Sequence, residues 1–318
     1  MDDHRFPPDH GLSARMGITV FLLGLLYALF VAALLVLGIP LVLVVVLAVG
    51  VLGFQYWFSD RVALFSMGGH LVTEAQAPQL HAVVDRLCAL ADMSKPKVAI
   101  ANSDIPNAFA TGRSPSHAVL CVTTGLMRRL DENELEAVLA HELSHVAHRD
   151  VAVMTVAGFL GIMAGLLTRF ALYAGLFGGF GMGGYGGGSR TSSRSRSSAG
   201  GGGQLALIEL GVLVVSAAVY ALSFLLIRTL SRYRELAADR AGAILIGRPS
   251  TLASALVKVT GDMSRIPTKD LRSASAFNAF YFAPIKSGSI SALFATHPSL
   301  DKRLEQLSKL ETQLDRPA

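Results

Sequence analysis

The sequence predicts a mainly helical protein with a small β-sheet and several transmembrane helices. Its 318 residues are 52% apolar and only 16% charged, a balance that is too apolar for an ordinary soluble domain. Four long segments lack charged residues, the first two of them joined in one stretch, and amphipathic and short β-rich stretches lie between the others. The net charge of +5 is spread over loops and ends rather than gathered in a basic motif, so we expect no nucleic-acid partner.

The first uncharged stretch, residues 16–58, follows a short polar tail at residues 1–15. It is too long for the apolar core of a signal peptide, and about 20 apolar residues suffice to span a bilayer. We therefore predict a hairpin of two transmembrane helices, Ile18–Leu37 and Leu41–Phe58. The residues between them, Gly38–Pro40, supply the turn.

Residues 151–228 contain two more uncharged runs, Val151–Thr168 and Leu210–Ile227. Each run has the minimum length for a transmembrane helix, so a second membrane hairpin is the favoured interpretation. Helices that lie on the membrane or pack against the protein are the alternative. The intervening residues 178–203 are rich in Gly, Ser and Arg and predict a disordered loop, because such a composition cannot bury a core.

Arginines near the ends of these spans predict the orientation, because basic residues are enriched on the cytoplasmic side. Those that would share one side are Arg5, Arg15, Arg61, Arg149, Arg228, Arg232 and Arg234. Arg190, Arg194 and Arg196 of the loop would lie on the far side and count against this orientation.

The two cysteines, Cys88 and Cys121, lack metal-ligand spacing, and as packed free thiols they would fit a reducing compartment. We therefore place residues 59–150 and 229–318 at the cytoplasmic face of the inner (plasma) membrane.

Residues 59–130 differ in character, because charged residues return and β-rich segments appear. Gln79–Ala91 has the spacing of an amphipathic helix, and Lys97–Ala101 and Ala118–Thr123 predict short strands. Between the strands, Asn107–Gly112 could form a simple turn. It could also form an exposed edge strand to which an extended peptide adds, a mode of binding that needs little sequence preference.

Residues 131–150, DENELEAVLAHELSHVAHRD, predict one helix with a polar cluster on one side. Asp131 can cap its start, and Glu134 three positions later would complete a capping box. Farther along, His141, Glu142 and His145 form an H-E-x-x-H pattern. At about 100° per residue the two imidazoles lie one turn apart, and the Glu142 carboxylate points to the same side.

This pattern suits zinc-dependent peptide hydrolysis. Neutral imidazoles are common zinc ligands, catalytic zinc sites usually have three protein ligands, and the open position holds a water with a pKa of about 7. Glu142, beside the ligands but not one of them, could take the proton of this water and pass it to the leaving amine. A chance occurrence of the pattern in a structural helix is the alternative.

A third ligand is predicted just after the fourth uncharged run. Ser231–Ala243 predicts a helix on which Glu235 and Asp239 lie one turn apart. Glu235 is the natural third ligand, and Asp239 could accept the N–H of a ligand imidazole and so fix the orientation of that ring. Spacing alone equally allows a solvated helix whose alternating charges pair at i,i+4.

Four segments together resemble the HtpX-type membrane zinc metallopeptidases, relatives of the CAAX prenyl protease. They are HELSHVAHRD (141–150), SRYRELAADRAGA (231–243), NAFATG (107–112) and Thr296–Pro298 with Asp301 and Arg303. The order of the motifs and the apolar hairpin before them also match, over residues 18–307. The resemblance implies a zincin-like (gluzincin) catalytic domain, and it does not extend to the Gly/Ser/Arg loop or the tails.

The resemblance also implies roles for individual residues in the metal site. His141, His145 and Glu235 would bind one zinc ion. Glu142 would act as general base and acid, and Asp239 would orient His141. These assignments agree with the roles that residue type and spacing allow.

Other residues would face the substrate if the resemblance holds. Asn107, Ala108 and Phe109 would lie along the substrate cleft. His297, near Arg303, could donate a hydrogen bond to the oxyanion of the tetrahedral intermediate. A helix-capping or core role fits His297 as well.

One further histidine, His148, falls back on the helix face of His141 and invites assignment as a fourth ligand. The metzincin pattern, however, requires Gly and a further His where Ala147 and Val151 stand. We therefore expect His148 to be a structural or surface residue.

These observations predict an integral-membrane zinc endopeptidase that cleaves membrane proteins or unfolded polypeptides at the cytoplasmic face. Only a few residues separate His145 from the third uncharged run and Glu235 from the fourth, so the zinc should lie near the membrane surface. The resemblance implies quality control of misfolded or damaged membrane proteins under stress, with self-cleavage. An inactive metal-binding scaffold that regulates a partner is one alternative. A prenyl-protein processing protease is another, for which four spans are few.

Overall fold

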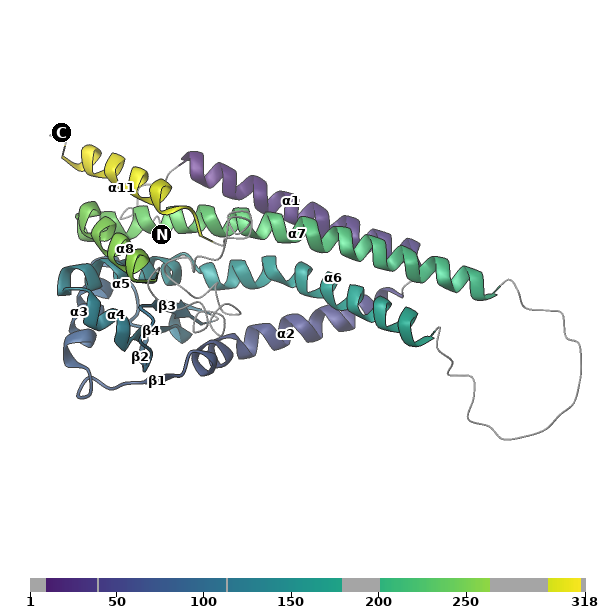
Figure 1. Cartoon of the computed structure of the whole chain (residues 1–318), viewed down its shortest axis with the longest axis horizontal. Helices are drawn as coiled ribbons and strands as arrows, with labels where there is room; N and C mark the ends of the chain where they lie inside the picture. The colour runs from purple at the N-terminus through teal and green to yellow at the C-terminus, as the bar shows by residue number, and fades with distance from the viewer. Residues whose placement is uncertain (1–9, 39, 113, 179–200, 264–296, 316–318) are drawn as a thin grey trace, which may run out of the picture. The chain divides into compact units, whose positions relative to one another are not determined.

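The computed structural model describes residues 10–38, 40–112, 114–178, 201–263 and 297–315 (Figure 1). The chain divides into two compact units, each assembled from separate parts of the sequence. The first unit comprises residues 1–19, 53–155 and 228–318, and the second comprises residues 20–52 and 156–227. The first unit therefore contains every predicted site residue, and the second contains most of the uncharged stretches.

A four-stranded sheet lies in the first unit, with the strand order β1-β2-β4-β3. Its strands are β1 (Gly69–Leu71), β2 (Lys97–Ala101), β3 (Ala108–Thr111) and β4 (Val119–Thr123). β2 and β4 are parallel, and the edge strands β1 and β3 pair antiparallel with them. The two predicted strands are confirmed, and Asn107–Gly112 contains an edge strand rather than a simple turn. The strand β1 was not predicted, because three residues are too few to show alternation.

Helices cover one face of this sheet, some packed on the strands and others, at the carboxyl end of the chain, packed on those helices (Figure 1). They are α3 (Pro78–Ala91), α4 (Thr124–Arg129), α5 (Glu132–Ala147), α8 (Pro249–Met263) and α11 (Leu300–Leu314), and a short 3-10 turn (Pro115–His117) precedes β4. Leu120 and Val122 of β4 share the main core with Leu139 of α5 and Leu307 of α11. The predicted amphipathic helix is confirmed as α3.

The opposite face of the sheet carries a smaller core that includes Phe109, Val119 and Cys121. Because side chains alternate along a strand, Cys121 reaches this face while its neighbours in β4 reach the other. Cys88 and Cys121 are both free and buried, as predicted. Burial raises the pKa of the Cys88 thiol to about 11 and that of the Cys121 thiol to about 12.

Four long helices correspond to the four uncharged runs. They are α1 (His10–Val36), α2 (Leu41–Ser66), α6 (Asp150–Gly178) and α7 (Gly201–Ile246). Within the described residues, two segments are long and apolar enough to cross a membrane, Gly11–Val36 and Leu210–Ile246, while the apolar segments of α2 and α6 are shorter. The four predicted helices are confirmed, and membrane crossing by each of them stays a prediction. Most of the predicted loop, residues 179–200, lies outside the described residues.

The second unit has apolar side chains on its outside and an apolar cluster inside, together with a few buried small polar side chains. Phe21 is 69% exposed and Val214 is 59% exposed, whereas Ser216 and Ser223 are fully buried. A Cβ added at Gly161 of α6 would lie 3.4 Å from the Ser223 hydroxyl of α7, so the two helices approach closely at this glycine. Small residues and buried hydroxyls are typical of helix contacts in membranes.

Candidate active site

Helix α5 is fixed at its ends by side chains. Asp131 Oδ1 accepts the Glu134 backbone N–H at 2.9 Å, and Glu134 Oε2 accepts the Asp131 N–H at 3.1 Å, which forms the predicted capping box. Lys258 of α8 also donates to the buried Glu134 carboxylate. At the other end the exposed His148 ring lies 2.7 Å from the Ser144 carbonyl oxygen. His148 is thus a surface residue at the helix terminus, as predicted.

Helix α7 carries the later part of the site and approaches α5 closely. It runs without a break from Gly201 to Ile246, so the fourth uncharged run continues directly into the segment with Glu235 and Asp239. A Cβ added at Gly242 would lie 2.8 Å from the backbone nitrogen of His141 and 2.9 Å from its Cα. A glycine at this position therefore lets the two ligand-bearing helices touch.

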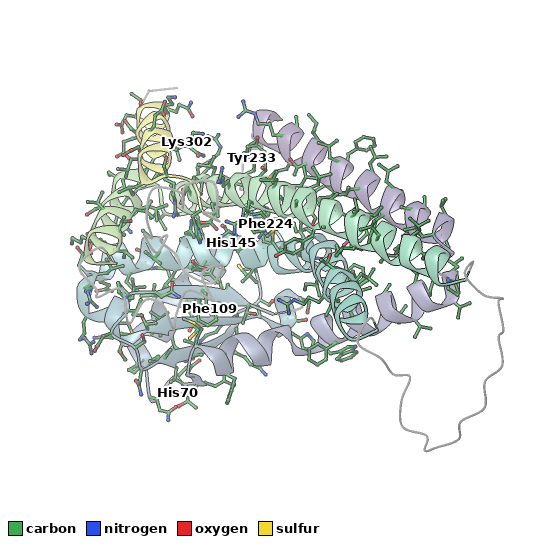
Figure 2. The ribbon with its side chains drawn as sticks, turned by 45° about the vertical axis from the view of Figure 1, so that its right-hand side comes forward. His70, Phe109, His145, Phe224, Tyr233 and Lys302 are labelled. Atoms are coloured by element: carbon green, nitrogen blue, oxygen red, sulfur yellow. The ribbon has the colours of Figure 1, made fainter. Side chains whose placement is uncertain are left out.

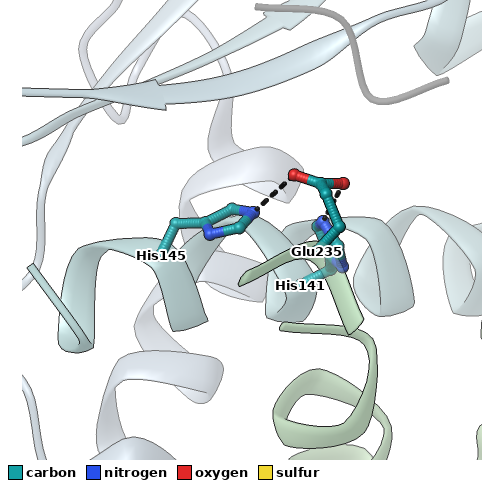
Figure 3. A group of neighbouring side chains, drawn as sticks. All are labelled: His141, His145 and Glu235. Carbon is teal, nitrogen blue, oxygen red and sulfur yellow. Dashed lines mark ion pairs between the residues drawn. The ribbon is translucent and has the colours of Figure 1, made fainter. Parts of the chain in front are cut away.

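The three predicted metal ligands, His141, His145 and Glu235, meet in the structure (Figure 3). Their ligand atoms all lie within 4.8 Å of one another. Nε2 of His141 is 3.7 Å from Glu235 Oε2, and Nε2 of His145 is 3.5 Å from Glu235 Oε1. The two imidazole rings are nearly perpendicular, at 89°, so their Nε2 atoms converge from different directions.

These separations fit a shared metal ion. Contacts of 3.5 and 3.7 Å are too long for good N–H···O hydrogen bonds. Two atoms bound at about 2.0–2.1 Å to one tetrahedral ion, by contrast, lie roughly 3.3 Å apart. Each ring also turns its other nitrogen, Nδ1, toward a carboxylate, which leaves Nε2 for a metal. Two imidazole nitrogens and one carboxylate are a ligand set that zinc commonly takes.

A buried carboxylate and arginine hold the ring of His141. Its Nδ1 lies 3.0 Å from Oδ1 of Asp239, the residue expected to orient this ring. Arg303 of α11 donates to Asp239 twice, from Nε at 2.7 Å and from Nη2 at 2.6 Å. Burial lowers the pKa of His141, which keeps the ring neutral as a zinc ligand must be.

His145 has a matching support that the sequence did not predict. Its Nδ1 lies 2.6 Å from Asp150 Oδ2, and Arg234 Nη2 lies 2.7 Å from the same oxygen. Burial lowers the pKa of His145, but Asp150 and Glu235 outweigh burial and raise it to about 10. Burial raises the pKa of Asp150, but His145 and Arg234 outweigh burial and lower it to about 2. The available signal was an acidic residue five positions after the second histidine, outside the H-E-x-x-H pattern.

Glu142 is buried beside the three ligands without being one of them. The backbone N–H of Ala110 in β3 donates to Glu142 Oε2 at 3.1 Å, which ties the carboxylate to the edge strand. Burial raises the pKa of Glu142 to about 7. A group that gains and loses a proton near neutral pH is suited to general acid–base catalysis.

The remaining predicted residues differ in how they relate to this centre. His297 Nδ1 lies 2.9 Å from Glu235 Oε2, so His297 joins the site next to a ligand. The Arg303 guanidinium is bound to Asp239 and is 1% exposed. Phe109 is buried in the sheet core, on a different element from His145 (Figure 2). The predicted contacts of His297, Arg303 and Phe109 with substrate stay predictions.

The segment Asn107–Ala108 leads into the edge strand and is buried. The Asn107 backbone N–H donates to Thr123 Oγ1 at 2.9 Å, and its carbonyl oxygen accepts the Thr123 backbone N–H at 2.9 Å. These bonds fix the start of β3 against β4. The Ala108 side chain packs in the main core with residues of α5, and the Ala110 N–H is the backbone group of the strand that reaches Glu142.

Two histidines one turn apart on a helix, a later glutamate and a second buried glutamate beside them define a metallopeptidase. The comparison with known proteins agrees: the model of peptidase family M48 matches residues 74–311. The chain belongs to this family and is of its HtpX type. The family resemblance of the sequence motifs is thereby confirmed.

Similar proteins cover almost the whole chain. "Protease HtpX homolog 1" of Streptomyces coelicolor is 60% identical over 312 residues, which are 98% of this chain and 96% of that protein. "Protease HtpX homolog" of Moorella thermoacetica is 50% identical, over 96% of this chain and 97% of that protein. The protein of the same name from Pyrococcus furiosus is 37% identical, over 82% and 83%. Among solved structures, the crystal structure of S. mikatae Ste24p matches with a TM-score of 0.48 and 18% identity, over 93% of this chain and 66% of that one.

Proposed function

We propose that this metallopeptidase is an integral-membrane zinc endopeptidase that cleaves misfolded or damaged membrane proteins, and unfolded polypeptides, at the cytoplasmic face. The observation that carries the proposal is the meeting of three ligand atoms within 4.8 Å, beside the buried Glu142 carboxylate. His141, His145 and Glu235 would hold one zinc ion per chain. Their burial favours a site that excludes bulk water until a substrate enters.

Zinc held by these three groups would supply Lewis-acid chemistry, because it activates a water and polarises a carbonyl. The side chains of the protein supply the proton transfers. Since the Ala110 N–H holds Oε2 of Glu142, its Oε1 is left to take the proton of the attacking water and give it to the leaving amine. His297, next to Glu235, would donate to the oxyanion that develops on the substrate.

The edge strand β3 supports the proposed substrate class. It pairs with β4 on one side, and on the other side its Ala110 N–H points toward Glu142. A peptide that adds to this edge as a further strand would be held by backbone hydrogen bonds to the alternate residues of β3 that do not pair with β4, beginning with Ala108. Such binding requires an extended chain and little sequence preference. Unfolded and misfolded proteins present such chains.

The second unit supports a membrane location. Many of its exposed side chains are large and apolar, and its buried ones include the small polar Ser216 and Ser223 beside an apolar cluster, which is typical of helices that pack in a membrane. Because His145 precedes the third apolar run and Glu235 follows the fourth by only a few residues, substrates in or near the bilayer are favoured. The arginines at the span ends favour a cytoplasmic active site.

The substitution Glu142→Gln tests the catalytic proposal. Glutamine keeps the shape of the side chain and an acceptor for the Ala110 N–H, but it cannot act as a base. We expect cleavage of casein and of a membrane-protein substrate to fall at least about 100-fold, while zinc content, measured by mass spectrometry, stays at one ion per chain. Glu132→Gln, at an exposed position on the same helix, is the matched control and should cleave normally.

The outcomes separate the proposal from its alternatives. Normal cleavage by Glu142→Gln would contradict the assigned base. A zinc-loaded wild type that cleaves neither substrate would favour an inactive scaffold, and a wild type that cleaves prenylated peptides alone would favour prenyl-protein processing. A purified protein without bound metal would overturn the zinc assignment.

The orientation can be tested by labelling a single introduced thiol. The native thiols of Cys88 and Cys121 are buried, so Ser308→Cys, at an exposed position of α11, should be the thiol that reacts. A membrane-impermeant maleimide should label Ser308→Cys in inverted membrane vesicles and not in right-side-out vesicles. The opposite pattern would place the active site outside the cytoplasm.

A further inference from the structure

We infer that Asp150 and Arg234 form a positioning pair for His145, so that the metal affinity of the site depends on residues that are not themselves ligands. This inference rests on the proposed zinc site. Asp150 Oδ2 lies 2.6 Å from Nδ1 of His145 and 2.7 Å from Nη2 of Arg234. A single carboxylate oxygen therefore joins the ligand ring to the arginine.

The contact with Asp150 determines which nitrogen of His145 can bind a metal. A carboxylate accepts the Nδ1–H, and the lone pair of the neutral ring is then on Nε2, the atom that faces Glu235. The bond also limits rotation of the ring about its link to α5. Asp150 thus keeps a proton on Nδ1 and orients the ring, so that the Nε2 proton is the one that a zinc ion displaces.

The chain reaches this position through an unusual backbone conformation. Helix α5 ends at Ala147, and Arg149 has a φ of 54°, in the left-handed region that residues with side chains rarely adopt. The turn brings Asp150, the first residue of α6, back to the ring of His145. Backbone strain of this kind persists where the surrounding contacts fix the conformation.

Arg234 links the carboxylate that positions His145 to α7, the second ligand-bearing helix. It immediately precedes Glu235 in α7, and both charged groups of the Asp150–Arg234 pair are about 8% exposed. The ion pair therefore fixes the distance between the first residue of α6 and the turn of α7 that carries the third ligand. Charge-assisted hydrogen bonds of this length are stronger and more directional than neutral ones.

The test is the zinc affinity of the full-length protein in detergent, measured by competition with a chelator. Asp150→Asn should weaken zinc binding by about 10- to 100-fold, because the amide no longer favours the Nδ1–H form of His145. Asp85→Asn, an aspartate of α3 that pairs with Lys95 at the surface, is the matched control and should bind zinc like the wild type. Cobalt substituted for zinc should show a changed visible spectrum in Asp150→Asn alone.

Two Arg234 variants separate positioning from a general loss of folding. Arg234→Lys can keep one N–O contact and should bind zinc within about threefold of the wild type, whereas Arg234→Gln should bind it more weakly. Saturating zinc should restore most of the kcat of each variant, which a misfolded protein would not show.

Unchanged zinc affinity in Asp150→Asn, while the wild type binds zinc, would overturn this inference and leave the proposed function standing. A defect that saturating zinc cannot restore would overturn it as well. A wild type that binds no zinc would overturn the proposed metal site and this inference with it.

Discussion

The two histidines of the metal site are supported differently, although each faces a carboxylate that an arginine binds. On the His141 side, Arg303 donates twice to Asp239, at 2.7 and 2.6 Å, and neither side chain is more than 1% exposed. Burial lowers the pKa of His141, so its ring stays neutral. The charge of Asp239 is therefore balanced by the arginine rather than by the imidazole.

On the His145 side, two groups share the balancing charge. Arg234 makes one 2.7 Å contact with Asp150. The pKa of His145 is raised to about 10 despite its burial, so without a metal this ring is positively charged as well. The comparison teaches that an arginine contributes most to the stability of a buried carboxylate where the neighbouring imidazole is neutral.

The largest test of this difference compares Arg303→Met with Arg234→Met. Removing Arg303 leaves Asp239 charged, buried and beside a neutral ring, which should destabilise the folded protein by about 3–5 kcal/mol. Removing Arg234 leaves Asp150 with a protonated His145, so the loss should be about 2 kcal/mol, the typical contribution of a hydrogen bond to a charged group. Thermal unfolding of metal-free protein in detergent, in a Glu142→Gln background that lacks the proposed catalytic base, measures both.

Lys309→Met serves as the control for this comparison. It removes an exposed cation that pairs with Glu305 on α11, and its unfolding temperature should match that of the parent protein. Equal losses of folding stability in Arg303→Met and Arg234→Met would show that the charge on His145 does not compensate for Arg234.

A second test addresses the close approach of α7 to α5, which places Asp239 beside His141. Gly242→Ala would put a methyl group within 2.9 Å of the His141 backbone, so the helices must separate. We expect a loss of about 1–3 kcal/mol and weaker zinc binding. Gly261→Ala in α8, where an added Cβ meets nothing within 4 Å, should instead be slightly stabilising, by about 0.5–1 kcal/mol. Zinc binding by Gly242→Ala equal to that of the parent would show that the approach is not needed.

The site was predictable from sequence where its signals are local. The capping box of Asp131 and Glu134 and the spacing of His141 and His145 lie within one helix, and simple periodicity predicts both. Glu235 is far away in the sequence, and spacing alone left its role open until the motif resemblance was added. Fold elements with long uncharged or alternating stretches were predicted for the same reason, whereas the three-residue strand β1 was not.

The features that sequence did not predict depend on contacts between distant segments. Asp150 supports His145 only because Arg149 adopts a left-handed conformation and Arg234 arrives from another helix. The role of Gly242 likewise depends on which backbone lies against it. A pattern of residue types along one helix contains no information on either contact, so these positions require the structure.

The smallest expected effect is a difference in acid stability that belongs to the His145 side. The pKa of Asp150 is lowered from 3.8 to about 2 in the folded protein. A lowered carboxyl pKa contributes stability that is fully present above about pH 4 and is lost as the pH falls through about 2. For metal-free protein the contribution is about 2 kcal/mol at pH 7, and about 1 kcal/mol of it should be gone at pH 3. The gap in unfolding temperature between the parent and Asp150→Asn should therefore narrow between pH 5 and pH 3.

Arg234→Met sharpens this last test, because Arg234 is one of the two groups that lower the pKa of Asp150. Without the arginine the pKa should rise toward its ordinary value, and the acid dependence should weaken while His145 maintains part of it. Between pH 5 and pH 3 an imidazole without a carboxylate partner is protonated in both the folded and the unfolded chain. Titration of His145 itself therefore does not obscure the result. A gap of constant size from pH 5 to pH 3 would mean that the Asp150 charge is not coupled to folding. In that case the Asp150–Arg234 pair beside His145 would not differ from the Asp239–Arg303 pair beside His141 in the way that their charges imply.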